Sequence, residues 1–269
     1  MRPERILAAV FAAACMLGLA ACATTGGTSA TSSSARAKPA GDPENPKTKI
    51  AKDNTALGLG YMQQGKLEVA LEKLQKALAA DPRHADAHTV IAVLFERIGD
   101  NVHAEEHYRR AAQLRPKSGN ENNNLGWFLC NKLARYDEAA THFEIAVADP
   151  FYQTPAVALA NAGTCALKGG RLDAAERDLR LALERGPDNA EALVQMADLL
   201  YRKNEFFKAR AFIQRYEAIG QPTAQSLLLG RNIELRLGNG TAAVDYTRRL
   251  RERFPDSEQA RSLNVPVSP

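Results

Sequence analysis

Length, composition and charge already exclude some classes of protein. The chain has 269 residues, of which 45% are hydrophobic and 25% charged, and this length suits either two ordinary domains or one long repeat array. The 35 basic and 31 acidic residues give a formal net charge of +4, and without a dense Lys/Arg stripe this balance does not indicate a nucleic-acid partner.

Residues 1–21 are predicted to be a lipoprotein signal peptide. Arg2 and Arg5 precede an apolar run, which ends in the sequence Leu-Ala-Ala-Cys at residues 19–22. This ending resembles a bacterial lipobox, in which small residues admit a membrane protease and the thiol of Cys22 accepts a diacylglycerol. A plain secretory signal with an incidental Cys22 is the alternative. A membrane-spanning helix is disfavoured because the run is shorter than the ~20 residues that cross a bilayer.

The segment after the signal is predicted to be a lipidated flexible tether, residues 22–49. It is rich in Ala, Thr, Ser, Gly, Pro and Lys and has no helical or strand period. Ala23 follows the lipobox cysteine, where Asp would favour retention in the inner membrane. We therefore expect delivery to the outer membrane, with the folded part facing the periplasm.

Residues 50–256 repeat with a period near 34, which is typical of tetratricopeptide repeats. The pair Leu57-Gly58, for example, returns 34 residues later as Ile91-Ala92. An all-α array of about six helix-turn-helix repeats, wound as a right-handed superhelix with a concave groove, is expected. The predicted repeats lie near 51–84, 85–118, 119–152, 156–189, 190–222 and 223–256. Residues 257–269 are predicted to be a flexible tail.

Residues 149–155 interrupt the repeat spacing with two prolines and two adjacent aromatic residues. They add three residues between the third and fourth repeats. We expect an ordered linker here, and a bend in the array.

Residues 103–107 read H-x-x-E-H, a pattern of some zinc peptidases. However, Ala104 and Tyr108 fall on repeat landmarks, so this segment is predicted to be an ordinary second helix of a repeat. We find no third metal ligand, nucleophile motif, phosphate loop or dinucleotide fingerprint. The sequence therefore predicts neither an enzyme nor a cofactor, metal or small-molecule site.

The cysteines predict a disulfide. Cys15 leaves with the signal peptide and Cys22 is lipidated, so Cys130 and Cys165 remain as a pair in an oxidising compartment. Both fall in the first helices of successive repeats, which are neighbours in such an array. Two buried free thiols are the alternative.

The expected groove is lined by first-helix residues that lie outside the packing pattern. Asparagine amides can pair with a peptide backbone, and an aromatic ring can anchor an apolar side chain. Ordinary solvated surface is the alternative for each residue, and packing between repeats is the alternative for Trp127. The candidates are Leu59, Met62, Gln63, Thr89, Val93, Glu96, Arg97, Asn120, Asn123, Trp127 and Asn131.

Four stretches of the sequence resemble one family specifically: "NNNLGWFLC", "ADPFYQTPAVALANAGTCAL", "EALVQMADLLYRKNEFFKAR" and "AQSLLLG". They are similar to the PilF/PilW family of type IV pilus biogenesis and stability lipoproteins, and the resemblance covers about residues 50–254. It implies a lipid-anchored outer-membrane protein that helps the secretin, the pore of the pilus machinery, to reach or multimerise in the outer membrane. It also implies lipidation of Cys22 and pairing of Cys130 with Cys165. A general cell-envelope scaffold, serving peptidoglycan enzymes or outer-membrane assembly, is the alternative.

Overall fold

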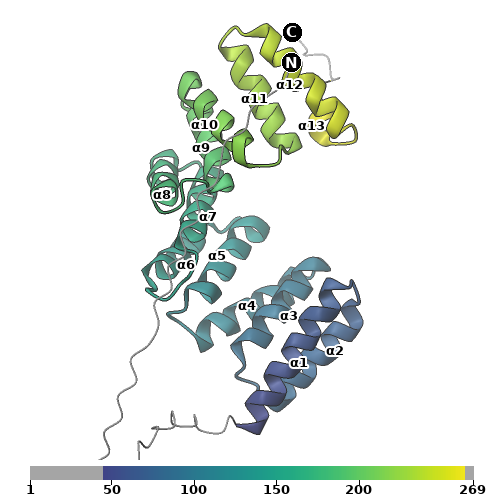
Figure 1. Cartoon of the computed structure of the whole chain (residues 1–269). Coiled ribbons are helices and arrows are strands. Elements are labelled where there is room, and N and C mark those ends of the chain that lie inside the picture. Colours follow the sequence, from purple (N-terminus) through teal and green to yellow (C-terminus); the bar gives the residue numbers. More distant parts are fainter. Residues whose placement is uncertain (1–44, 264–269) are drawn as a thin grey trace, which may run out of the picture. The chain divides into compact units, whose positions relative to one another are not determined.

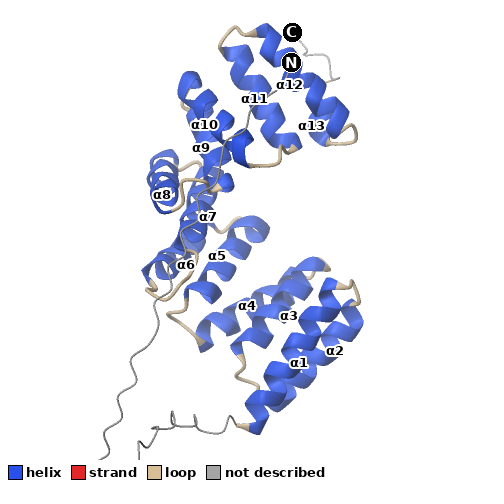
Figure 2. Cartoon of the chain, viewed as in Figure 1, coloured by secondary structure: helices blue, strands red, loops and turns tan. Residues whose placement is uncertain are grey.

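The computed structural model describes residues 45–263, which form thirteen α-helices and no strand (Figure 2). The signal peptide, Cys22 and most of the expected tether lie outside the described residues. Within this range no helix is both long enough and apolar enough to cross a membrane. The helices are α1 (Pro46–Gln63), α2 (Leu67–Ala80), α3 (Ala85–Arg97), α4 (Asn101–Leu114), α5 (Gly119–Leu133), α6 (Tyr136–Ala148), α7 (Pro155–Lys168), α8 (Leu172–Arg185), α9 (Ala190–Arg202), α10 (Phe206–Ile219), α11 (Ala224–Arg236), α12 (Gly240–Arg253) and α13 (Glu258–Ser262).

The first twelve helices form six helix-turn-helix pairs, from α1/α2 to α11/α12 (Figure 1). Each pair stacks on the next through its second helix, so that α2 packs on α3 and α4 packs on α5. First helices are also neighbours, as in the contacts of α7 with α5 and α9. The all-α array of six repeats is therefore confirmed.

Small residues at the crossing points let the two helices of a pair approach closely. A Cβ atom on Gly163 of α7 would lie 2.6 Å from Cγ of Leu179 on α8, a distance that no real Cβ tolerates. The same contact recurs in the first pair, where Gly58 faces Leu74. This close packing explains why glycine or alanine returns at the same place in each repeat.

The turns inside the pairs require a left-handed backbone. Glycine supplies it in four pairs, whereas Ala134 (φ 52°) and Asn204 (φ 60°) supply it in the third and fifth. Glycine adopts this conformation without steric cost, and asparagine tolerates it better than most residues. Ala134 is thus a departure from the repeat pattern. The glycines are Gly65, Gly99, Gly170 and Gly238.

The linker between α6 and α7 is held by specific contacts. Asp149 accepts hydrogen bonds from the backbone N–H of Gly119 at 2.7 Å and of Phe151 at 2.9 Å. The ring of Tyr152 is buried against Gly119, while Phe151 is 83% exposed. The extra residues therefore form an ordered connection between the third and fourth repeats.

Two expected boundaries are wrong. Helix α1 begins at Pro46, inside the predicted tether, because the Asn45 side chain caps its first turn by accepting the N–H of Lys47 at 3.0 Å. The predicted flexible tail begins with a helix, α13, whose N-cap Ser257 accepts the N–H of Ala260 at 3.1 Å. Ala260 is buried against α11 and α12, so this short helix covers the end of the array.

Candidate protein-binding surfaces

The predicted groove residues lie on α1, α3 and α5, but they differ in exposure. Leu59, Gln63, Val93, Arg97 and Asn120 are exposed, and Thr89, Glu96, Asn123, Trp127 and Asn131 are half-buried. Met62 was wrongly assigned to the groove, because its side chain is 3% exposed and packs in the core cluster of the first two repeats.

The half-buried residues of α5 are joined to α7 by polar contacts. The Asn161 amide donates to Oδ1 of Asn123 at 2.9 Å, and Lys168 donates to Oδ1 of Asn131. The Lys168 ammonium also lies 5.9 Å from the ring centroid of Trp127, whose ring packs on the core of the second and third repeats. The two asparagine amides thus already have partners inside the array, which a bound peptide would have to displace.

Two predicted groove residues of α3 likewise connect neighbouring helices. Glu96 accepts a hydrogen bond from the Tyr108 hydroxyl at 2.9 Å, and its carboxylate lies 3.6 Å from the Lys132 ammonium. Arg97 donates to the carbonyl of Met62 at 3.0 Å. These contacts stabilise the stacking of the repeats. The exposed apolar residues of the predicted set are Leu59 and Val93.

The H-x-x-E-H segment forms part of α4 and holds two different histidines. His103 is exposed and lies 2.6 Å from Oδ2 of Asp100, whereas Nδ1 of His107 lies 2.9 Å from Nδ1 of His88. Nε2 of His88 is 3.1 Å from the carbonyl of Pro82, which can only accept. His88 therefore carries its proton on Nε2 and accepts from His107. Residues 45–263 contain no group of three or more His, Cys, Asp or Glu able to hold a metal ion.

This histidine pair predicts acid sensitivity. Burial lowers the pKa of both His88 and His107, and the proximity of His88 lowers that of His107 further. Both rings stay neutral in the folded protein, so the unfolded chain takes up protons first as the pH falls. Their contribution to stability is present above the ordinary histidine pKa of about 6.5 and is lost as the pH falls below it. We expect a lower melting temperature at acidic pH by circular dichroism.

A His107→Gln variant should show a smaller drop in melting temperature between neutral and acidic pH than the wild type. Burial also lowers the pKa of His142, so part of the drop should remain. His103→Gln, which changes an exposed histidine on the same helix, is the matched control. It also removes the side chain that lowers the pKa of Asp100, so melting is compared only down to about pH 5, where carboxyl groups are still ionised. Over that range the control should keep the full drop. An identical drop in His107→Gln and the wild type would contradict the role of the pair.

Cys130 of α5 and Cys165 of α7 form a disulfide in the structure, with their Cα atoms 5.9 Å apart. Both side chains are buried. The bond joins the first helices of the third and fourth repeats next to the polar contacts of Asn131 and Lys168. It therefore spans the same junction as the linker.

The outer side of α1 presents an apolar stripe that the sequence reasoning did not single out. Leu57 is 51% exposed and lines a shallow hollow with its neighbours at helical spacing. Leu57 and Tyr61 occupy packing positions of the repeat pattern. In α1 no earlier repeat among the described residues covers them. The hollow is lined by Asp53, Ala56, Leu57, Gly60, Tyr61, Gln64 and Lys66.

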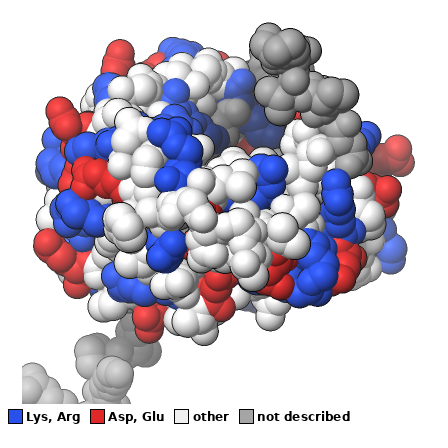
Figure 3. Space-filling model, turned by 90° about the horizontal axis from the view of Figure 1, so that it is seen from above, with Lys and Arg blue, Asp and Glu red and all other residues white. Residues whose placement is uncertain are grey.

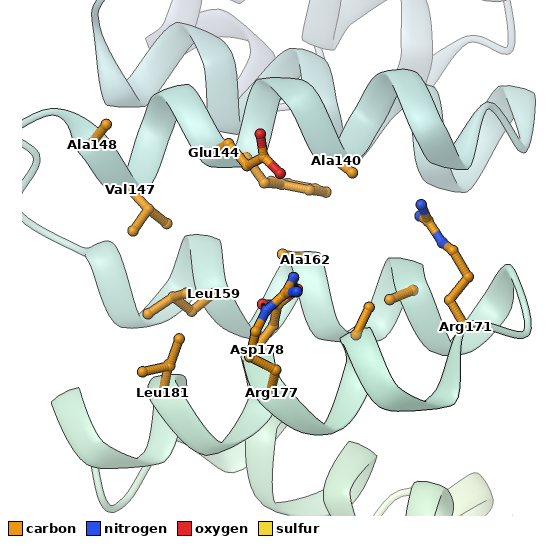
Figure 4. A pocket seen from close by; sticks show the side chains of 13 residues that line it. Ala140, Glu144, Val147, Ala148, Leu159, Ala162, Arg171, Arg177, Asp178 and Leu181 are labelled. Atoms are coloured by element: carbon orange, nitrogen blue, oxygen red, sulfur yellow. Dashed lines mark hydrogen bonds and ion pairs between the residues drawn. The ribbon is translucent and has the colours of Figure 1, made fainter.

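A second cleft lies between α6 and α8, with α7 as its floor (Figure 4). Its volume is about 560 Å³, and its lining is mostly apolar. Leu159 and Ala162 of α7 lie on the floor, while Val147 of α6 and Leu181 of α8 belong to the walls. Ala166 of α7 also lines the cleft. The sequence reasoning predicted no binding surface on this side of the array.

Charge does not mark a single binding surface. On the face shown in Figure 3, Lys and Arg side chains are interspersed with Asp and Glu, and no continuous basic stripe crosses it. The cleft itself is bordered by Glu144 on α6 and by Arg177 and Asp178 on α8, of which the last two form an ion pair at 2.9 Å. The candidate surfaces are thus apolar hollows with charged edges, as protein-binding sites commonly are.

Comparison with protein families confirms the repeat type. Residues 55–119 and 166–231 each match a tetratricopeptide-repeat family. A curated protein of Pseudomonas aeruginosa, type IV pilus assembly protein PilF, is 32% identical over 201 residues, which cover 75% of this chain and 79% of that protein. An uncharacterised protein of Haemophilus influenzae is 31% identical over 129 residues, covering 48% of this chain and 72% of the relative.

Two solved structures share the architecture over the whole array. The crystal structure of PilW, described as a widely conserved type IV pilus biogenesis factor, superposes with a TM-score of 0.75 at 32% identity and covers 81% of this chain and 99% of that one. The structure of Pseudomonas aeruginosa PilF gives a TM-score of 0.72 at 30% identity and covers 81% and 98% of the two chains. The similarity thus extends over nearly the full length of both solved chains.

Proposed function

Because the chain belongs to the PilF/PilW family of tetratricopeptide-repeat proteins of type IV pilus biogenesis, we propose that it is a lipid-anchored outer-membrane assembly factor that binds the pilus secretin. Binding promotes the localisation or multimerisation of the secretin in the outer membrane. The observation that carries this proposal is the match to PilF, which includes 79% of that protein. The role is one of protein interaction and not of catalysis.

The lipobox supports the anchoring part of the proposal. Residues 23–45 separate Cys22 from the first residue of α1. A flexible chain of this length has an r.m.s. reach of about 25 Å. The acylated cysteine would therefore keep the array near the membrane, where a secretin subunit arrives. Helix α1 follows the tether directly, so its apolar stripe is the surface nearest the anchor along the chain.

Deletion of the gene tests the function. We expect the secretin to remain monomeric and surface pili to be lost, and re-expression of the wild-type chain should restore both. Immunoblots of unheated membrane fractions measure the secretin multimers, and electron microscopy measures the pili. Normal multimers and pili, accompanied by a general envelope or growth defect, would contradict this proposal and favour a general cell-envelope scaffold.

A Cys22→Ala variant tests the anchor separately. Without the thiol no diacylglycerol can be attached, so the variant should accumulate as an unprocessed precursor or as a soluble periplasmic protein. Incorporation of labelled palmitate should fall to background, whereas a Cys15→Ala variant should be labelled like the wild type. Equal labelling of Cys22→Ala and the wild type would refute the lipobox assignment.

A further inference from the structure

The fourth repeat lacks two large side chains that the other five repeats carry. In each first helix, two positions four residues apart flank the closely packed Gly or Ala on either side. In α7 both positions are alanine, Ala162 and Ala166. The corresponding pairs are Leu57 and Tyr61, Ile91 and Phe95, Leu125 and Leu129, Met196 and Leu200, and Leu229 and Ile233.

The missing side chains account for the cleft between α6 and α8. The corresponding hollow one repeat earlier, between α4 and α6, has a volume of about 240 Å³ against about 560 Å³ here. There Leu125 contributes to the floor, and the hydrogen bond between Asn122 and His142, 2.8 Å long, crosses the space. In the fourth repeat alanine replaces leucine on the floor, so the space stays open.

The cleft is not a sign of loose packing around α7. Phe143 of α6 and Leu179 of α8 are buried, and so is Ala166 on the floor. Gly163 faces Leu179 in the close contact described above. The cleft is therefore a preformed socket between well-packed helices, and its shape does not depend on a bound molecule.

We propose that this cleft is a docking site for an amphipathic helix of a partner protein, which places two large apolar side chains over Ala162 and Ala166. Leu159, Ala162 and Ala166 are spaced as i, i+3 and i+7 along α7 and span about 10 Å. The parallel helices α6 and α8 wall this line on both sides (Figure 4). A helix laid along the cleft presents apolar residues at the same spacing, and the small floor residues let its backbone approach closely.

The edges of the cleft define the charge of the occupant. Arg177 is paired with Asp178 on the α8 side, whereas Glu144 is exposed on the α6 side. Arg171, which also lines the cleft, is paired with Asp137 at 2.7 Å. Among the charged residues of the lining, Glu144 is therefore the one that forms no ion pair within the described part of the chain. The docked helix therefore carries a Lys or Arg on the flank that faces Glu144. This inference does not require the partner to be the secretin, and it can fail or succeed independently of the proposed function.

Filling the cleft from within tests the proposal. A double variant, Ala162→Leu with Ala166→Leu, restores the residue type of the other repeats and occupies the space that the partner would use. Its melting temperature should equal or exceed that of the wild type. The matched control is Ala211→Leu with Ala218→Leu, which changes two exposed alanines of α10.

The binding probe is the photo-crosslinking residue p-benzoylphenylalanine placed at Leu181, a wall residue that is partly exposed. In cells, we expect a crosslink to a segment of another protein with two large apolar residues three or four positions apart and a flanking Lys or Arg, identified by mass spectrometry. The yield should fall at least tenfold in the filled variant and stay unchanged in the control. A Glu144→Arg variant, a surface change that does not touch the core, should lower the yield to a similar degree.

Four results would overturn the proposal: no crosslink at all, a crosslink only to a second copy of this chain, a crosslinked segment without the apolar pair, or a yield that neither filling the cleft nor Glu144→Arg reduces. If the double leucine variant melts well below the wild type, Glu144→Arg decides alone, and an unchanged yield in it refutes the docking site.

Discussion

Replacing both Cys130 and Cys165 by alanine is expected to lower the free energy of unfolding by about 4 kcal/mol. The disulfide closes a loop whose ends are 35 residues apart, and in the chain-entropy model a crosslink of this span removes that much conformational freedom from the unfolded chain. It ties α5 to α7 across the junction where the linker interrupts the repeat spacing. The third and fourth repeats should therefore lose stability most.

Urea unfolding followed by circular dichroism measures this effect. Dithiothreitol should shift the wild-type curve to lower urea and leave the double alanine variant unchanged, which makes the variant the control for reduction. Mature protein unfolded without reductant should contain no thiol from Cys130 or Cys165 that reacts with iodoacetamide. Full alkylation of both cysteines, or a wild-type unfolding curve that dithiothreitol does not shift, would show that the disulfide does not form in the purified protein.

The consequences should extend to the candidate surfaces, because α7 takes part in several of them. Its Cys165 end carries the disulfide, Asn161 and Lys168 bond to α5, and Ala162 and Ala166 form the floor of the cleft. Loss of the disulfide removes one of the contacts that fix α7 against α5. A reduced protein should therefore show a lower crosslinking yield at Leu181 as well as lower stability.

The repeat pattern was sufficient to predict the helical pairs because its recurring residues are those that pack between adjacent helices. Helices α3, α5 and α9 begin at Ala85, Gly119 and Ala190, the first residues of the repeats predicted from the landmarks. The two ends were predicted less well. Their signals are local ones, the Asn45-Pro46 start of α1 and the Ser257 cap of α13, and these have no counterpart in the repeat pattern.

The candidate binding surfaces were harder to predict because they lie where the sequence departs from the repeat pattern or where the array ends. Leu57 occupies a packing position of the repeat pattern, yet its side chain is exposed because α1 lies at the end of the described array. Ala162 and Ala166 carry a visible signal, since the fourth repeat alone lacks the large pair. Hydrogen bonds such as that between Asn123 and Asn161 depend on how one repeat is rotated on the next. The spacing of residues in the sequence does not specify that rotation.

Trp127 was predicted to be either a groove anchor or a packing residue, and the structure shows a ring that packs on the core of the second and third repeats and is only half-buried. Trp127→Ala is therefore expected to lower the free energy of unfolding by about 3 kcal/mol, the lower end of the range for removing a large aromatic side chain from a core. Trp127→Leu keeps much of the buried apolar area and should recover part of this loss.

The double change Trp127→Ala with Asn123→Ala separates packing from binding. It also removes the acceptor of the Asn161 amide, which adds about 1 kcal/mol of destabilisation. If Trp127 acts mainly by packing, secretin multimers should fall only as far as the folded fraction falls, and Trp127→Leu with Asn123 intact should restore both together. Thermal melting and the yield of secretin multimers, measured on the same strains, decide the matter. A double variant that melts like the wild type but assembles no secretin multimers would contradict the packing role and identify Trp127 as a groove anchor. A double variant with normal melting and full assembly would exclude both roles at this site.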